Sequence, residues 1–446
     1  MKFNRKIVKD VLKLALPAVG EMTLYMMIWV FDTMMVGQYG GNLALSSVGL
    51  SSEILYTFSN ILISCGISIG ITSLVARNVG AKEYAMAEEY ATLGFLTSLF
   101  ISILFSLTFF LLSTHLLTAV GAEKQVVILG SVYMKITSIG IGFNMIMNAL
   151  NAALRGFGNT KTPLLASIIV NIVNLSLDYI LIFGKLGFPT LGTMGAAIAT
   201  TTAQIIGFLF IVFYMYNVSS IKVRLKYIKD LNTSMLKGLF DLSIPSSFQE
   251  GAFSISRLLS NFFIVSLGSI AFAANQITTA IESISFMPGW GFAVAATALV
   301  GHKIGEKDYK GAKEYAYVSI FLATLVMTFC SMLFFLFPRT LISLFINSSE
   351  QEVIRLGALC LMIAAIEQPF IAISMVVGGA LKGNGDTKSP LKVSIFTSWI
   401  IRVPLMFVII YLLKLSVIYV WIITSIQWII DGILIFIIFR RKHKNI

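Results

Sequence analysis

The sequence predicts an all-α polytopic membrane protein in which twelve transmembrane helices form two pseudo-symmetric six-helix bundles. Three observations support this fold class: an unusually apolar composition, twelve long apolar runs, and motifs that recur at a constant offset. Hydrophobic residues make up 57% of the 446 residues and charged residues only 12%, whereas an average soluble chain is roughly 45–50% apolar and about 25% charged. This composition excludes a soluble enzyme.

Each apolar run is long enough for one membrane crossing. A membrane helix needs roughly 20 mostly apolar residues, and every backbone polar group must be satisfied within the segment, which favours helices. The predicted spans are residues 11–37, 46–73, 89–113, 127–151, 163–184, 193–216, 238–267, 275–299, 313–337, 356–379, 392–413 and 416–439.

Lysines and arginines collect in the terminal segments and in alternate loops. Of the 33 basic residues, we assign 25 to these segments and the span ends that adjoin them, six to the opposite side of the membrane, and two, Arg257 and Arg402, to the interior of spans. Because basic residues of short loops stay on the cytoplasmic side, we expect a protein of the plasma or inner membrane with both termini in the cytoplasm. The net charge of +12 is thus explained by basic residues that orient the chain in the membrane. It therefore does not indicate a nucleic-acid partner.

Three motifs of the first half recur in the second half, with offsets of 228, 225 and 227 residues. A nearly constant offset indicates duplication, which is common in secondary transporters. Because each half has an even number of spans, both enter the membrane from the same side. The predicted lobes are residues 1–220 and 221–446. The paired motifs are Leu16–Glu21 with Ile244–Gln249, Val79–Ala91 with Ile304–Ala316, and Ala152–Pro163 with Gly379–Pro390.

Ionisable residues within spans are informative because each costs roughly 2.5–3.5 kcal/mol on insertion scales. The first span contains Glu21 and Asp32, which share a face because eleven residues make about three helical turns. Pro17 lies one turn before Glu21 and removes a backbone hydrogen bond, so the helix can bend there. We expect Asp32 to act in ion coupling and Glu21 to lie near the mouth of a substrate cavity; structural pairing is the alternative for both.

The fifth span carries a row of polar residues on an otherwise apolar helix: Ser167, Asn171, Asn174 and Asp178, spaced by four, three and four residues. Such a row must face protein or water. The sixth span begins with small residues, which permit close helix approach, and then contains Thr200. We predict that Asp178 acts with Asp32, whereas a single Asn or Thr within a span commonly forms only an interhelical hydrogen bond.

The second half differs at these positions. By the repeat offset Asp32 corresponds to Ser260 and Asp178 to Leu405, so the acid pair is confined to the first half. The spans of the second half contain other charged residues, which are Glu250, Arg257, Glu282, Glu367 and Arg402. An arginine could neutralise a carboxylate there, and the pairing is left open.

No constellation of residues predicts catalysis. Cys65, Cys330 and Cys360 lie in apolar stretches without paired spacing, and the three histidines are scattered over loops and chain ends. Neither a disulfide framework nor a metal centre nor a catalytic nucleophile follows. We therefore expect no enzymatic activity and no cofactor other than a coupling H⁺ or Na⁺.

Several motifs together resemble one family of transporters over the whole chain. The motifs are LP at residues 16–17, FDTMMVG at 31–37, NIVNLSLDYILIFG at 171–184, GAAIAT at 195–200, and the loops ALRGFGNTKTP at 153–163 and ALKGNGDTKSP at 380–390. In this order, on a duplicated twelve-span chain, they resemble the multidrug and toxic compound extrusion (MATE) transporters of the MOP superfamily, and among them the DinF-like branch.

The resemblance implies a V-shaped pair of lobes that exports amphipathic, often cationic compounds in exchange for H⁺ or Na⁺. It further implies a coupling-ion site at Asp32, Asn174, Asp178 and Thr200, with Na⁺ possible at the first three, and a helix that bends at Pro17. In the NorM-type branch an acid of the seventh span is important. Here that position is Phe253, and Glu250 lies one turn earlier.

We expect the substrates to be small-molecule drugs or toxic metabolites and the protein to be a monomer within the lipid bilayer. Methionines and Tyr25 of the first span could form an adaptable apolar wall, although ordinary core or lipid-facing positions are the alternative. The residues predicted to line the cavity are Glu21, Tyr25, Met26, Ser167, Asn171, Gln249, Glu250, Phe253, Glu282 and Glu367.

Other transport functions are weighed against this one. A lipid-linked oligosaccharide flippase of the same superfamily would commonly have extra spans and a strongly cationic cavity, whereas this chain has twelve spans and only two arginines within them. A passive channel would not need paired acids away from a pore ring. Dependence of transport on an imposed ion gradient separates these possibilities from an antiporter.

Overall fold

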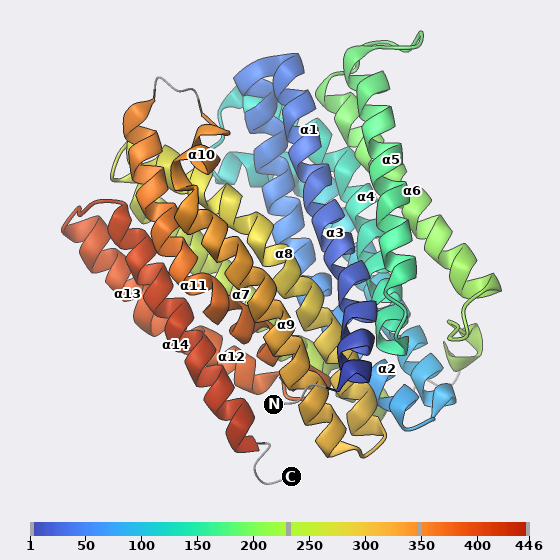
Figure 1. Cartoon of the computed structure of the whole chain (residues 1–446). Coiled ribbons are helices and arrows are strands. Elements are labelled where there is room, and N and C mark those ends of the chain that lie inside the picture. Colours follow the sequence, from blue (N-terminus) through green and yellow to red (C-terminus); the bar gives the residue numbers. More distant parts are fainter. Residues whose placement is uncertain (1–3, 229–232, 347–349, 443–446) are drawn as a thin grey trace. The chain divides into compact units, whose positions relative to one another are not determined.

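The computed structural model describes residues 4–228, 233–346 and 350–442, and in these ranges the chain forms helices and connecting loops without strands. Figure 1 shows long helices joined by short connections. The first half contains α1 (Arg5–Ser59), the π-helical η1 (Asn60–Ile67), α2 (Ser68–Gly80), α3 (Tyr84–Ala119), α4 (Lys124–Phe157), α5 (Lys161–Phe183), α6 (Thr193–Asn217) and a short 3₁₀ turn η2 (Leu225–Ile228).

The second half follows the same order of long helices. It contains α7 (Thr233–Val265), α8 (Ser269–Gly305), α9 (Tyr309–Leu336), α10 (Pro338–Ser343), α11 (Gln351–Gly383), α12 (Lys388–Ile395), η3 (Phe396–Arg402), α13 (Val403–Met406), η4 (Phe407–Leu412) and α14 (Ile418–Lys442). The eleventh predicted span is thus a helix of four pieces, Lys388–Leu412, in which π-helical turns alternate with α-helical ones.

Within the described ranges, ten helices are long and apolar enough to cross a membrane. The first of them, Arg5–Gly80, covers the first two predicted spans and is interrupted at Gly41, whose φ of 58° and ψ of −149° are accessible essentially only to glycine. The seventh predicted span, residues 238–267, overlaps α7, which is not one of these ten helices. The all-helical, multi-pass fold class is confirmed.

The chain packs as two compact units. The N-unit is Gly20–Ser247, and the C-unit combines Met1–Val19 with Phe248–Ile446. Helices α1 and α7 therefore pass from one unit to the other, and both changes fall two residues after a proline within the helix, Pro17 and Pro245. The lobes expected at residues 1–220 and 221–446 stay a prediction.

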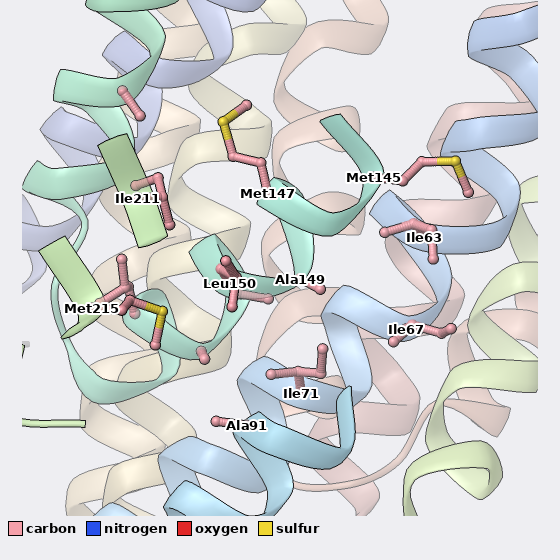
Figure 2. Packing of buried hydrophobic residues seen from close by; sticks show 14 of the residues in the cluster. Ile63, Ile67, Ile71, Ala91, Met145, Met147, Ala149, Leu150, Ile211 and Met215 are labelled. Carbon is pink, nitrogen blue, oxygen red and sulfur yellow. The ribbon is translucent and has the colours of Figure 1, made fainter. Parts of the chain in front are cut away.

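Each unit is built around one central helix. In the N-unit α4 packs against α2, α3 and α6, and in the C-unit α11 packs against α8, α9 and α14. These are repeat-equivalent helices, so the duplication extends to the packing. Figure 2 shows the N-unit core around α4, where buried aliphatic and methionine side chains interdigitate: Ile63, Ile67, Ile71, Ala91, Met145, Met147, Ala149, Leu150, Ile211 and Met215.

The repeated loop motifs have a structural explanation. Thr72 of α2 donates a hydrogen bond to the Ala152 carbonyl at 3.1 Å, and Gly156 of the same motif has no side chain where it meets the Thr72 backbone. At the equivalent place in the C-unit, Thr297 donates to the Gly379 carbonyl at 3.0 Å. The spacing of small residues thus allows the central helix to approach its neighbour closely.

The turns that follow these motifs are also equivalent. Gly158 and Gly385 have positive φ angles of 93° and 85°, which glycine adopts without strain. Asn159 Oδ1 then accepts the Thr162 backbone N–H at 3.1 Å, and Asp386 Oδ1 accepts that of Ser389 at 3.0 Å. These motifs therefore terminate one helix and begin the next, as expected of tight turns.

Candidate functional site

The N-unit contains a buried polar site formed by three helices. Asp32 comes from α1, Asn174 and Asp178 from successive turns of α5, and Thr200 from α6. Asn174 and Asp178 are fully buried, and Asp32 is only 7% exposed. The four residues predicted for ion coupling are thus brought together in the fold, although the first and last are 168 positions apart.

A hydrogen-bonded chain links the three helices. Asn174 Nδ2 donates to Thr200 Oγ1 at 3.4 Å, and Thr200 Oγ1 donates to Asp32 Oδ2 at 3.2 Å. The side chain of Asp178 lies within hydrogen-bonding reach of Asp32. A single hydroxyl therefore couples α1 to α6.

Close contact between α5 and α6 positions this chain. A Cβ atom on Gly195 of α6 would lie 2.7 Å from the backbone of Leu181 of α5, so only glycine allows the two helices to approach to this distance. The small residues at the start of the sixth span therefore allow close helix approach, as predicted. They place Thr200, about one and a half turns further along α6, against Asn174.

Four oxygen atoms at the site lack donors. Both carboxylate oxygens of Asp178, Asp32 Oδ1 and Asn174 Oδ1 are buried and have no hydrogen-bond partner among the described residues. Leaving buried polar atoms unsatisfied is costly, and placing two carboxylates side by side costs more unless a positive charge compensates them. A proton or a small cation would satisfy both requirements.

Glu21 is on α1, like Asp32, but lies apart from the four-residue site. Its Oε1 forms a buried ion pair with Arg155 Nη1 of α4 at 2.8 Å. Arg155, which the sequence analysis places in a loop, is in fact in the last turn of α4 and only 6% exposed. Its position three residues before the loop glycine Gly158 was the available signal that it still belongs to the helix.

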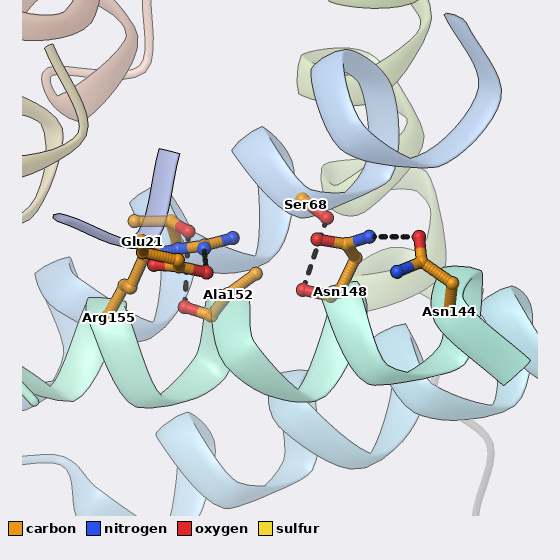
Figure 3. Close-up of polar contacts among 7 residues, drawn as sticks. Glu21, Ser68, Asn144, Asn148, Ala152 and Arg155 are labelled. Atoms are coloured by element: carbon orange, nitrogen blue, oxygen red, sulfur yellow. Dashed lines mark hydrogen bonds and ion pairs between the residues drawn. The ribbon is translucent and has the colours of Figure 1, made fainter. Parts of the chain in front are cut away.

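A row of polar groups along α4 extends from this ion pair, as Figure 3 shows. Ser68 donates to the Asn148 carbonyl at 3.4 Å, and Asn148 Nδ2 donates to Asn144 Oδ1 at 2.8 Å. Asn144 Nδ2 then donates to Gln204 Oε1 of α6 at 2.8 Å. Gln204 is one turn beyond Thr200 on α6, so this row of hydrogen bonds ends on the helix that carries Thr200. Asn144 and Asn148 are not among the site residues predicted from the sequence.

The other residues predicted to line the cavity are divided between the two units. In the N-unit Tyr25 packs edge-on against Tyr56 with ring centroids 6.1 Å apart, Asn171 donates to the Ser167 carbonyl of its own helix at 2.8 Å, and Met26 is partly buried. None of these three contacts the acid pair through a described hydrogen bond. Their assignment to a substrate cavity stays a prediction.

In the C-unit the predicted residues fall into two groups. Gln249, Glu250 and Phe253 lie on α7, where Ser254 donates to Glu250 Oε1 at 3.4 Å and Phe253 packs against Trp428 with ring centroids 5.8 Å apart. Glu282 and Glu367 form a separate buried cluster with Gln368 and Arg402.

Asp431 of α14 is a further buried acid, outside the set of residues predicted from the sequence. Ser374 donates to its Oδ1 at 2.5 Å, and Thr397 donates to its Oδ2 at 2.8 Å. An acid in the middle of a predicted span, here the twelfth, is itself a sequence signal for a buried charged residue.

Comparisons with known proteins agree with this fold. The MatE family model matches residues 17–180 and 245–408, one match in each half. A probable multidrug resistance protein NorM of Thermotoga maritima is 31% identical over 444 residues, which cover 98% of this chain and 91% of that protein. An uncharacterized transporter, YisQ of Bacillus subtilis, is 27% identical over 87% of this chain and 84% of its own length.

Solved structures show the same architecture. The outward-facing conformation of a multidrug resistance MATE family transporter of the MOP superfamily has a TM-score of 0.91, at 22% identity over 100% of this chain and 99% of that one. A MOP superfamily transporter from Pyrococcus furiosus has a TM-score of 0.90 at the same identity and coverage.

The duplicated helical fold and the apolar helices define a multi-pass membrane protein. The chain belongs to the MatE family. The two relatives are named a probable multidrug resistance protein and a transporter. As a member of this family of transporters the protein is not an enzyme, as predicted.

Proposed function

We propose that the protein is a secondary antiporter that exports amphipathic, cationic drugs or toxic metabolites in exchange for H⁺ or Na⁺. The observation that carries this proposal is the buried carboxylate pair Asp32–Asp178. Three of its oxygens, together with Asn174 Oδ1, have no hydrogen-bond partner among the residues that the structure describes. The names of the multidrug resistance relatives support the class of substrate.

The proposed coupling site comprises Asp32, Asn174, Asp178 and Thr200. A proton would bridge the two carboxylates, and Na⁺ would use the same oxygens together with Asn174 Oδ1. Either ion lowers the charge of the two carboxylates from −2 to −1. Because Asp32 is on α1, that change would alter the Thr200–Asp32 hydrogen bond, which links α1 to α6. Because Pro17 removes a backbone hydrogen bond where α1 changes from one unit to the other, α1 would bend there as the ion binds and is released.

The direct test is dye transport by the purified protein in vesicles with an imposed pH or Na⁺ gradient. We expect uptake of a fluorescent cationic dye to depend on one of the two gradients and to be abolished in Asp32→Asn, since the amide cannot release a proton or neutralise a cation. Normal transport by Asp32→Asn would contradict the coupling site. Dye movement indifferent to both gradients would instead favour a passive channel or a flippase.

A second variant tests the hydrogen bond that couples the helices. Thr200→Val removes a donor to a carboxylate, and such bonds contribute about 1.5–3 kcal/mol, so we expect the ion concentration for half-maximal uptake to change by about tenfold or more. Thr201→Val is the matched control, because Thr201 donates only to the Ile136 backbone carbonyl at 3.0 Å. Equal effects of the two substitutions would contradict a special role for Thr200.

The same proposal places the protein in the plasma or inner membrane as a monomer with both termini in the cytoplasm. The distribution of basic residues supports this orientation. Labelling of single cysteines at the two termini with a membrane-impermeant reagent checks it: we expect no labelling in intact cells and labelling after permeabilisation.

A further inference from the structure

A cavity of about 480 Å³ lies at one end of the C-unit, between the end of α9, the short helix α10 and the start of α11. This volume is in the range of small-molecule binding sites, which is roughly 300–1,000 Å³. Within this unit, the cavity is at the opposite end from Lys442, the last residue of α14 (Figure 1). The cavity therefore belongs to neither the proposed coupling site nor the repeated loop motifs.

A break in the helix forms this cavity. Phe337 leaves helical geometry, with φ −125° and ψ 41°, and Pro338 then begins α10, because proline has no N–H with which to continue α9. In the N-unit, α3 runs without a break over Tyr84–Ala119. With the offset of 227 between the loop motifs, Pro338 corresponds to Leu111 of α3. The break that makes the cavity is thus specific to the second half of the chain.

Packing against α11 fixes the position of α10. The side chain of Ile342 is fully buried, and a Cβ atom on Gly357 of α11 would lie 3.1 Å from Ile342 Cδ1. The glycine therefore gives Ile342 the space to contact α11 closely. The cavity is bounded by packed helices and not by a free loop.

Two arginines line the cavity. Arg339 lies three residues after the end of α9, and Arg355 is the fifth residue of α11. Both side chains are exposed, and neither forms an ion pair or a side-chain hydrogen bond with any residue in the described ranges. No acid is among the described residues that line the cavity. Two guanidinium groups without a compensating acid favour an anionic ligand.

Neither the duplication nor the orientation of the chain accounts for these arginines. With the offset of 227, Arg339 and Arg355 correspond to Leu112 and Ile128 of the N-unit. They are also two of the six basic residues assigned to the side of the membrane opposite the basic loops. Basic residues are disfavoured on that side, so a ligand is the simplest reason for two of them at one cavity.

The apolar part of the lining identifies the class of anion. Leu336, Phe337 and Leu359 line the cavity beside the arginines and are 66%, 54% and 41% exposed; we call these three residues the apolar wall. Both α9 and α11 are long and apolar enough to cross a membrane. The arginines at the ends of these helices then lie at the depth of lipid phosphates, and the apolar wall lies beside acyl chains.

We propose that this cavity binds an anionic phospholipid, with Arg339 and Arg355 holding the phosphate and the apolar wall contacting the acyl chains. Guanidinium groups donate paired hydrogen bonds to phosphate oxygens. A soluble anion would use the arginines but would gain nothing from the apolar wall. In the proposed orientation the lipid belongs to the outer leaflet, and its binding is independent of ion coupling and drug export.

Native mass spectrometry of the purified full-length protein tests this site. The protein is titrated with dioleoyl phosphatidylglycerol and, separately, with dioleoyl phosphatidylcholine, which has the same acyl chains but no net charge. We expect the first phosphatidylglycerol to bind at least about tenfold more tightly than the first phosphatidylcholine. Arg339→Gln and Arg355→Gln should each weaken phosphatidylglycerol binding by about tenfold and leave phosphatidylcholine binding unchanged.

Two further variants separate a built site from a general attraction of charges. Lys414→Gln is the matched control, because Lys414 is an exposed basic residue of the same unit that does not line the cavity; we expect no change. Leu359→Trp fills the cavity and keeps both arginines, so it should weaken phosphatidylglycerol binding as an arginine variant does. Inorganic phosphate, added as a competitor at the lipid concentration, should not displace the lipid.

Equal affinity for the two lipids, equal effects of Lys414→Gln and Arg339→Gln, or an unchanged affinity in Leu359→Trp would overturn the proposal. Displacement by inorganic phosphate would overturn it too, because the ligand would then be a soluble anion. Thermal unfolding shows which variants are folded, and either arginine variant with the control is sufficient. Because the titration uses no ion gradient, its failure is distinct from failure of dye export by the wild-type protein.

Discussion

At the scale of single residues, the buried acids of this protein differ in what compensates their charge. Glu21 is paired with Arg155, and Asp431 accepts two hydroxyl hydrogen bonds. Asp32 and Asp178 instead lie close to each other. Three of their carboxylate oxygens have no hydrogen-bond partner within the described part of the chain. The same functional group thus serves as an ion-pair partner, as a hydrogen-bond acceptor or, in the proposal for Asp32 and Asp178, as an ion-binding site, according to its neighbours.

The Glu21–Arg155 pair leads to a prediction about stability. Removing one partner of a buried pair leaves the other charge uncompensated, at a cost of about 3–5 kcal/mol. We therefore expect Glu21→Gln to lower the thermal unfolding temperature strongly. The double variant Glu21→Gln with Arg155→Met should recover most of the loss, because no unpaired charge remains.

The measurement is a double-mutant cycle: thermal unfolding of Glu21→Gln, of Arg155→Met and of the double variant, each compared with the wild type. If the double variant were as unstable as the sum of the single ones, the two side chains would act independently. In that case the ion pair would not be the reason for their burial.

At the scale of the helix, glycine positions decide how closely α11 packs. A Cβ on Gly379 would lie 2.4 Å from the Ala293 carbonyl oxygen of α8, whereas one on the adjacent Gly378 would meet nothing closer than 3.9 Å. The two neighbouring glycines therefore have different roles in the same sequence motif.

We expect Gly379→Ala to destabilise the protein by about 1–3 kcal/mol through overpacking against backbone. Gly378→Ala should be close to neutral, or slightly stabilising because alanine favours the helix. Thermal unfolding of both variants compares them at matched helix propensity. Equal stabilities would show that α8 can move away from α11 at little cost.

The turn before α12 is sensitive to pH. Burial would raise the pKa of Asp386, but its ion pair with Lys442 and its hydrogen bonds with Ser389 outweigh burial and hold the pKa below its usual value of 3.8. A lowered folded-state pKa stabilises the fold above the unfolded-state pKa, and this contribution is lost as the pH falls through the folded-state value.

We expect Asp386→Asn to reduce stability by up to about 1 kcal/mol at neutral pH, since Lys442 is half exposed. The amide still accepts the Ser389 N–H, so the variant isolates the ion pair. The difference from the wild type, followed by thermal unfolding against pH, should disappear in acid. A difference that stays constant well below pH 3.8 would contradict this assignment.

At the scale of the whole molecule, two helices belong to both compact units. The changes occur at residues 19–20 of α1 and 247–248 of α7, each just after a proline that lacks a backbone donor. A conformational change between the units must therefore act on these two places.

We expect Pro245→Ala to slow ion-driven dye transport while leaving the protein as stable as before or more stable, because the helix regains a hydrogen bond. Pro369→Ala in α11 is the control, since this proline also lies within a helix but inside the C-unit. Transport rates in vesicles and unfolding temperatures are measured for Pro245→Ala and Pro369→Ala, so that an effect on transport is distinguished from an effect on stability. Equal transport by Pro245→Ala and the wild type would exclude a hinge at Pro245.

The apolar runs and the repeat offset determined the helical membrane fold, because burial of apolar surface in lipid and closure of backbone hydrogen bonds depend on local sequence. The spacing on α5 likewise identified Asn174 and Asp178 as one face. Only the tertiary structure decided which charges meet: Arg155 with Glu21, and Arg402 with Glu282 and Glu367. Electrostatic compensation depends on distances between helices far apart in sequence, and no local pattern encodes those distances.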